Sequence, residues 1–174
     1  MFISLQKLKS FSYALLCVAV LVSTTNKSAQ AQELKNTYND WSVYTIKQNG
    51  RMLCYAVSYP KKKTGNYSRR GEPYAMVTNI NGTDDEFSVT GGYKYKPGTE
   101  PRIKIDRKTY KLSLTKGEIA WPKTDKYDRI LTRKMRQGMT MKVTGTSIMG
   151  TYSIDTYSLK GFTKAHNRIR QLCS

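Results

Sequence analysis

The chain has 174 residues, of which 30 are Lys or Arg and 12 are Asp or Glu, so its net charge is +18 at pH 7. This length fits one domain of ordinary size that can bury a real core. The excess positive charge is spread along the chain and predicts attraction to lipid headgroups or polyanionic glycans, with genome composition and simple solubility as the other explanation.

The first 31 residues have the three parts of a secretory signal peptide. Lys7 and Lys9 precede an apolar stretch over 11–22, and Ala29 and Ala31 provide small side chains before a cleavage site. About twelve apolar residues are too few to span a bilayer as a helix. We therefore expect an exported protein whose single domain is residues 32–174, with an uncleaved signal anchor as the alternative. The leader holds three basic residues and no acidic one, so the mature chain carries 27 basic and 12 acidic residues, a net charge of +15.

The cysteines indicate an oxidising compartment. Cys17 lies inside the leader and leaves with it, so Cys54 and Cys173 remain in the mature domain. Two cysteines in an exported domain predict a disulfide bond. A metal pair or a catalytic thiol lacks partners, because the chain has one histidine and no Cys-x-x-Cys.

Alternation of apolar and polar residues predicts a domain made mostly of strands. The dipeptides Asn49-Gly50 and Asn81-Gly82 favour turns between strands. Lys61 to Glu72 has five basic residues and no aliphatic one, so we expect a solvated loop there. The expected strands cover 40–44, 52–59, 73–79, 86–90, 93–96, 102–105, 110–114, 139–145 and 150–159.

Two segments near the C-terminus have the pattern of short helices. Thr124 or Asp125 can cap a helix that runs to Gln137 and ends at Gly138. In the second helix, residues 162, 165, 169 and 172 form one apolar stripe. The expected fold is a β-sandwich of about eight short antiparallel strands with two short helices, one of them C-terminal.

No pattern of catalytic or metal-binding residues is evident. His166 is the only histidine, and Ser158 and Asp155 are its nearest triad candidates, but nothing else supports that assembly. Asp84-Asp85-Glu86 is the only acidic cluster, and we interpret it as a solvated turn rather than a weak calcium site. We expect a protein with no catalytic residues, no metal and no cofactor.

The densest basic run is a candidate contact surface for an acidic protein or an anionic glycan or lipid. A mobile solvated loop is the alternative for this segment, and nucleic acid is not an expected partner of an exported protein. We expect Trp41 and Trp121 to be buried core anchors. The candidate surface consists of Tyr59, Lys61, Lys62, Lys63, Tyr67, Arg69, Arg70 and Tyr74.

Four local signatures occur in order along the mature domain. They are Asp40-Trp41-Ser42-Val43 with Cys54-Tyr55-Ala56-Val57-Ser58; Arg70-Gly71-Glu72-Pro73-Tyr74-Ala75-Met76-Val77-Thr78; Ala120-Trp121 ahead of Met135-Arg136-Gln137-Gly138; and Gly145-Thr146-Ser147 with Asp155-Thr156-Tyr157-Ser158-Leu159-Lys160-Gly161-Phe162. In these features the chain resembles the invasion-associated locus B family of alphaproteobacterial exported proteins. The resemblance implies a β-sandwich in the periplasm or at the outer membrane, without known catalytic residues.

Two functions are consistent with these features. The first is a non-enzymatic exported interaction protein of the cell envelope, which the resemblance associates with virulence and host-cell invasion, of erythrocytes in the founding case. Its partner would be a host-cell surface protein or an anionic glycan or lipid. The alternative is a periplasmic factor that maintains the envelope or binds a small ligand. The receptor and the oligomeric state remain open.

Overall fold

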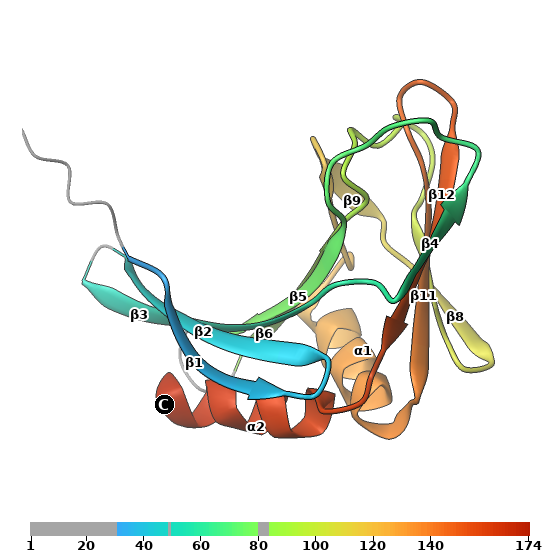
Figure 1. Ribbon diagram of the computed structural model, residues 1–174. Helices are drawn as coiled ribbons and strands as arrows, with labels where there is room; N and C mark the ends of the chain where they lie inside the picture. The colour runs from blue at the N-terminus through green and yellow to red at the C-terminus, as the bar shows by residue number, and fades with distance from the viewer. Residues whose placement is uncertain (1–30, 49, 80–83) are drawn as a thin grey trace, which may run out of the picture.

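The computed structural model describes residues 31–48, 50–79 and 84–174, and Figure 1 shows two antiparallel sheets with two helices. This arrangement confirms the mainly β fold with a C-terminal helix. The larger sheet bends strongly, with one concave and one convex face (Figure 1). Its seven strands, in spatial order, are β1 (Glu33–Tyr38), β2 (Trp41–Gln48), β3 (Arg51–Ser58), β5 (Tyr74–Asn79), β6 (Asp85–Thr90), β10 (Ile119–Trp121) and β9 (Leu114–Lys116).

The second sheet has five described strands and stands beside one end of the first (Figure 1). Its clearest pattern is in β7, where Ile103 and Ile105 are buried and Arg102 and Lys104 are exposed, as alternation requires. Its strands, in spatial order, are β4 (Lys62–Gly65), β12 (Tyr152–Ser158), β11 (Thr140–Thr146), β7 (Arg102–Ile105) and β8 (Lys108–Lys111).

Both predicted helices form over the expected residues. Helix α2 (Phe162–Leu172) buries its apolar stripe against the convex face of the seven-stranded sheet, below β1–β3 in Figure 1. Helix α1 (Asp125–Gln137) packs against β6 and α2. The acidic residues in its first turn and the basic residues in its last turn interact favourably with the helix dipole and stabilise the helix. The two helices therefore lie side by side on one side of the molecule.

Trp41 lies at the centre of the core and confirms the expectation for this residue. Its side chain is fully buried, and its ring packs edge-on against Phe162 with centroids 4.7 Å apart. The indole Nε1 donates a hydrogen bond to the backbone oxygen of Ser158 at 3.0 Å. Trp41 thus joins β2, α2 and β12 at one point, and truncation to Ala would remove contacts to all three.

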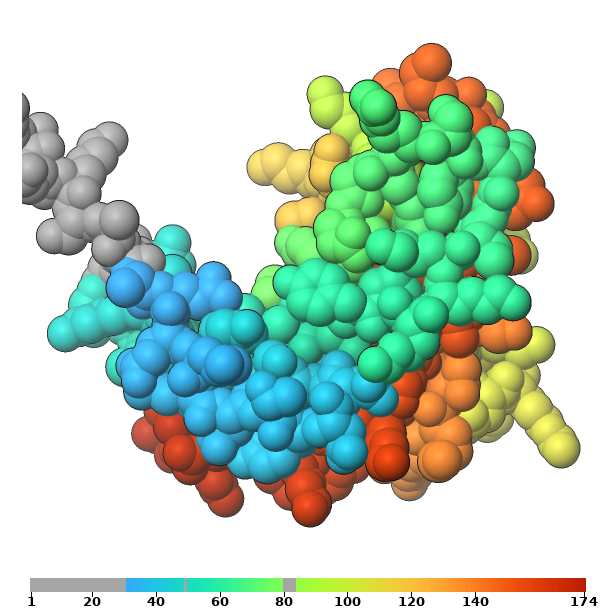
Figure 2. Space-filling model, in the orientation of Figure 1, coloured from blue at the N-terminus to red at the C-terminus, as the bar shows by residue number. Residues whose placement is uncertain are grey.

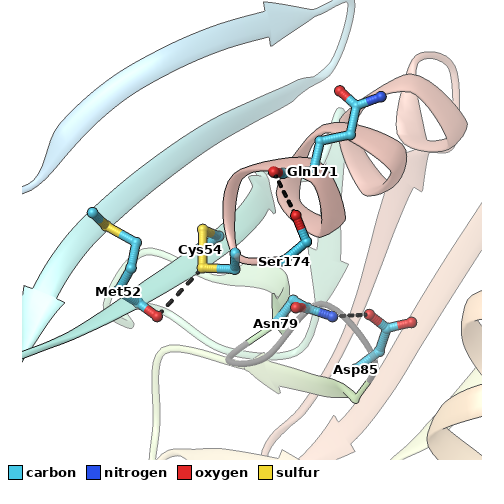
Figure 3. The surroundings of a disulfide bond; sticks show 7 residues. Met52, Cys54, Asn79, Asp85, Gln171 and Ser174 are labelled. Atoms are coloured by element: carbon cyan, nitrogen blue, oxygen red, sulfur yellow. Dashed lines mark hydrogen bonds between the residues drawn. A yellow bond between two sulfur atoms is a disulfide. The ribbon is translucent and has the colours of Figure 1, made fainter.

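The predicted disulfide is present and confirms the pairing of Cys54 with Cys173. The bond joins β3 to the end of α2, with Cα atoms 5.9 Å apart (Figure 3). No described helix is long and apolar enough to cross a membrane. The predicted leader over 1–30, Asn49 and the Asn81-Gly82 turn lie outside the described residues, so these predictions stand as predictions.

Two predictions about individual segments are wrong. Residues 93–96 do not form a strand; within them, Tyr95 makes an isolated bridge to Ser147. The segment from Lys61 to Glu72 is not wholly a solvated loop, because β4 pairs with β12 along four residues. This pairing fixes Lys62 and Lys63 of the predicted contact surface to the five-stranded sheet.

Candidate functional site

The structure separates the lysines of the predicted basic surface into paired and unpaired residues. Lys61 forms an ion pair with Asp40, and its hydrogen bond lowers the pKa of the Asp40 carboxyl. Lys63 donates to both carboxylate oxygens of Glu72, at 2.9 and 3.1 Å. Lys62 is exposed and makes no ion pair with a described residue. Two of the three lysines are therefore already neutralised.

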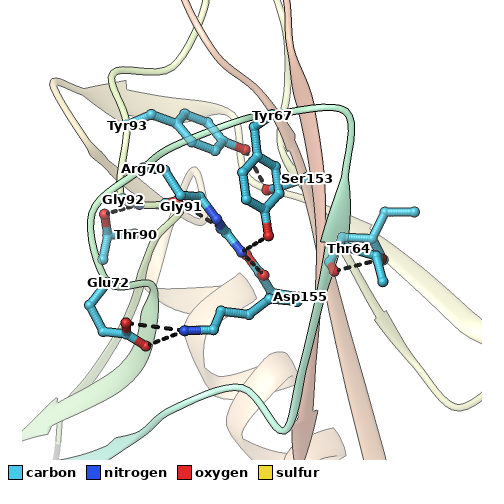
Figure 4. Close-up of polar contacts among 12 residues, drawn as sticks. Thr64, Tyr67, Arg70, Glu72, Thr90, Gly91, Gly92, Tyr93, Ser153 and Asp155 are labelled. Atoms are coloured by element: carbon cyan, nitrogen blue, oxygen red, sulfur yellow. Dashed lines mark hydrogen bonds and ion pairs between the residues drawn. The ribbon is translucent and has the colours of Figure 1, made fainter.

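Arg70 is not part of a contact surface, which corrects the prediction. Its side chain is 4% exposed and forms a two-pronged ion pair with Asp155, which is 1% exposed (Figure 4). Its Nη1 also donates to the backbone oxygen of Gly91 at 2.8 Å, and Nη2 donates to the Tyr67 hydroxyl at 3.1 Å. Burial alone would lower the pKa of Arg70, but the hydrogen bonds to Asp155 raise it, so the guanidinium stays charged.

Tyr67 serves the same buried cluster. The Arg70 guanidinium carbon lies 4.4 Å from the centre of the Tyr67 ring, which places a cation over an aromatic face. Figure 4 shows this ring beside the ion pair. The Tyr93 hydroxyl lies nearby and forms a hydrogen bond with the Ser153 hydroxyl at 2.7 Å. The cluster anchors the segment after β4 to β12. Tyr67 and Arg70 are thus structural, while the adjacent Arg69 is exposed.

A different surface gathers aromatic residues of β2 and β3 that the sequence analysis did not single out. Tyr44 of β2 pairs directly with Tyr55 of β3, and their rings stack with centroids 5.4 Å apart. Both lie on the face opposite α2, because Val43 and Ala56, their neighbours along the strands, point into the core. The ladder continues from Tyr55 through Thr78 to Glu86. Residues paired in one ladder share a face of the sheet.

Trp121 belongs to this same face, which corrects its assignment as a core anchor. Its side chain is only partly buried, and its Nε1 donates to the Glu86 carboxylate at 3.2 Å. Glu86 belongs to the same ladder as Tyr44 and Tyr55, so the indole lies over the open side of the sheet. The three-residue strand β10 was too short for alternation to show which side Trp121 takes.

Tyr59 and Tyr74 extend this surface. Burial, and to a smaller extent the nearby phenols of Tyr44, Tyr59 and Tyr74, together raise the pKa of Tyr55 to about 12. Tyr44, Tyr59 and Tyr74 therefore all lie near Tyr55. We call the surface the aromatic face; it consists of Tyr44, Tyr55, Tyr59, Tyr74, Met76 and Trp121. It lies on the concave side of the seven-stranded sheet, where Figure 2 shows the molecule hollowed.

Asp85 of the acidic cluster meets the single histidine on the opposite side of that sheet. His166 Nε2 lies 2.8 Å from Asp85 Oδ2, with side chains 2% and 6% exposed. Asn79 donates to the other oxygen of Asp85 at 3.0 Å (Figure 3). Burial alone would raise the pKa of Asp85, but the hydrogen bonds from His166 and Asn79 lower it. The prediction of a solvated turn is therefore wrong for Asp85.

These residues do not assemble a catalytic triad. Asp155 is held by Arg70, and the Ser158 hydroxyl accepts the Lys160 backbone N–H, so neither belongs to the His166 pair. The carboxylates of the acidic cluster diverge, because Asp85 faces His166 and Glu86 faces Trp121. Within the described residues, no group of three or more His, Cys, Asp or Glu residues could hold a metal ion.

Comparison with known proteins identifies the family of this chain. Residues 41–170 match the family model described as invasion associated locus B (IalB) protein. The chain belongs to the IalB family. The match runs from the start of β2 into α2, and so covers both sheets except β1, helix α1, most of α2 and the aromatic face.

A solved structure of the same kind supports the fold. The crystal structure of invasion associated protein B from Bartonella henselae is similar to this chain with a TM-score of 0.58 and 19% identity. The similarity covers 80% of this chain and 97% of that chain. A search of curated proteins found no significant match.

Proposed function

We propose that this IalB-family chain is an exported, non-enzymatic interaction protein of the bacterial envelope. The carrying observation is the aromatic face. Within the described residues no helix covers the concave side of the seven-stranded sheet, while α2 covers the other side. Partly exposed Tyr, Trp and Met are enriched at protein interfaces, and patches of this kind mark interaction sites.

The partner we propose is a protein of the host-cell surface. The Bartonella relative and the family both carry the words "invasion associated" in their names, and we extend that association to this chain. The strong positive charge would speed the encounter with an acidic surface through long-range attraction. Supporting an exported location, the chain has a leader-like N-terminus and the Cys54–Cys173 disulfide, which persists in oxidising compartments.

The test compares two double variants in a strain that lacks the wild-type gene. Y44S/Y55S removes the stacked pair of the aromatic face, and Y127S/Y152S removes two exposed tyrosines from other surfaces as a matched control. We expect Y44S/Y55S to lose most of the restored host-cell invasion at wild-type protein level, while the control keeps it. Equal invasion by the two variants, at equal protein level, would refute a role for the aromatic face.

The alternative, a periplasmic protein that binds a small ligand, is favoured by one separate observation. A cleft of about 580 Å³ opens between α1 and α2, on the opposite side of the sheet. This volume lies within the usual range of small-molecule sites. Its lining is rich in arginine and shares no residue with the aromatic face.

A further inference from the structure

The cleft between α1 and α2 concentrates positive charge. Arg129, Arg133 and Arg136 are spaced by four and three residues, so they lie on one face of α1. Arg170 faces them from α2. The lining contains four guanidinium groups and one carboxylate, that of Asp85.

The four cleft arginines are exposed and, like most cations of the described residues, form no ion pair. Arg70, Lys61, Lys63 and Lys111 each form an ion pair with a carboxylate. None of the four cleft arginines is ion-paired with a described residue. Asp85 cannot neutralise them all, because its two oxygens already bind His166 and Asn79. Four like charges in one cleft repel one another, and an anion placed between them would relieve that repulsion.

Two buried polar atoms on the cleft wall also lack partners. Thr132 Oγ1 and His166 Nδ1 are both buried and make no hydrogen bond with the residues that the structure describes. Both residues line the cleft. Buried polar atoms in proteins are nearly always hydrogen-bonded. Six buried side-chain atoms lack a partner among the described residues, and two of the six belong to residues of this cleft, where a bound ligand would supply one.

The chemistry of these groups defines the ligand. Guanidinium groups bind phosphate oxygens with paired hydrogen bonds, and several of them suit a group with more than one negative charge. The Thr132 hydroxyl can donate to a phosphate oxygen. Since His166 Nε2 faces the Asp85 carboxylate, it carries the proton in the neutral ring, and Nδ1 can accept from a ligand hydroxyl.

We propose that the α1–α2 cleft is a binding site for a phosphate-bearing, hydroxylated ligand. The ligand is either a free phosphorylated metabolite or the headgroup of an anionic lipid, and both present the same chemistry to the cleft. This site lies on the helical side of the seven-stranded sheet, away from the aromatic face. It is therefore independent of the proposed interaction surface.

The first experiment measures binding of pyrophosphate and glucose 6-phosphate by calorimetry, with the protein purified from cells that export it. The cleft variant is R129Q/R133Q/R136Q. The control R51Q/R69Q/R107Q removes the same charge from exposed arginines outside the cleft. We expect the cleft variant to lose about tenfold or more in affinity, the value of one charge-assisted hydrogen bond. The control should lose less than about threefold, through long-range charge alone.

A second variant tests the wall of the α1–α2 cleft without changing the charge of the cleft. T132V removes the unpartnered hydroxyl and nearly conserves volume, so folding should not suffer. We expect weaker binding of glucose 6-phosphate by several fold at unchanged thermal stability. Binding that is equal in wild type, T132V and the cleft variant would overturn the proposal, as would the absence of binding to both phosphate probes and to vesicles.

Vesicles distinguish the two sources of the phosphate. Wild-type protein is mixed with phosphatidylcholine vesicles that contain or lack phosphatidylglycerol. Binding to the anionic vesicles that the cleft variant loses, and the control keeps, assigns the site to a lipid headgroup. Binding of glucose 6-phosphate without binding to anionic vesicles assigns the site to a free metabolite, provided that the cleft variant loses this binding and the control keeps it. An equal loss of binding in both triple variants would show non-specific attraction and contradict a built site.

Discussion

Arg69 and Arg70 follow each other in the sequence but lie in opposite environments. Arg69 is exposed, whereas the Arg70 side chain is buried with Asp155 beneath the Tyr67 ring. Nothing in the local pattern separates them, because the partner of Arg70 lies 85 residues away. The sequence could therefore predict a basic run here, but not which of its cations reaches solvent.

This pair of neighbours provides a matched stability test. R70Q leaves the Asp155 carboxylate buried without its partner, and we expect it to lower the free energy of unfolding by about 3–5 kcal/mol. R69Q should change it by less than about 0.5 kcal/mol, as is usual for exposed sites. Urea unfolding of both variants at pH 7 checks this. Similar stability of R70Q and R69Q would contradict the buried ion pair.

Asp128 gives a residue-level prediction about pH. Burial raises the pKa of Asp128 to about 6, although its carboxylate accepts the Phe87 backbone N–H at 2.7 Å. The folded state therefore holds this proton more tightly than the unfolded state, whose value is about 3.9. The resulting stabilisation is present below pH 4 and is lost as the pH rises through 6.

The variant D128N does not titrate and isolates this effect. Its amide oxygen can still accept the Phe87 N–H, so the fold should be retained. We expect its stability relative to wild type to rise by about 1–3 kcal/mol between pH 4 and pH 7.5. Urea unfolding at the two pH values measures the difference, and a constant difference would show that the Asp128 pKa is not raised.

At the scale of elements, the sequence predicts well where alternation or a helical stripe is long. Strands β2 and β3, the β11–β12 pair and both helices lie close to their expected positions. Strand β4 was missed because all four of its residues are exposed and carry no apolar pattern. Charged edge strands of this kind are a common protection against aggregation, and their pairing is decided by the neighbouring strand.

The candidate site could also be predicted only in part from the sequence. The spacing of Arg129, Arg133 and Arg136 along one helix face was readable from the sequence, yet their meeting with Arg170 depends on how α1 and α2 pack. The pairing of His166 with Asp85 joins residues 81 positions apart. Contacts at such separations leave no periodic signal in a single sequence.

The disulfide is an element-level prediction, since it fixes α2 to β3 across 119 residues. Closing a loop of this length stabilises the folded state by about 4–5 kcal/mol in the chain-entropy model. We expect the variant C54S/C173S to lose a large part of this value in urea unfolding. Exported protein should also show no free thiol by mass spectrometry without reduction. Two alkylatable thiols would refute the bond in the native protein.

At the scale of the whole molecule, the two sides of the seven-stranded sheet have different chemistry. The convex side carries the helices, the disulfide and the arginine cleft, while the concave side carries the aromatic face. The sheet itself is held to the second sheet by the buried core around Trp41 and by the Arg70–Asp155 pair. A rigid scaffold of this kind presents a surface with little conformational cost on binding.

The most direct test of the interaction role is photo-crosslinking during contact of intact bacteria with host cells. A benzophenone amino acid is placed at position 55, on the aromatic face, or at position 152, on the outer face of the five-stranded sheet. The proposed function predicts a discrete adduct with one host-surface protein from position 55 and none from position 152. No adduct from position 55, or the same adduct from both positions, would contradict it.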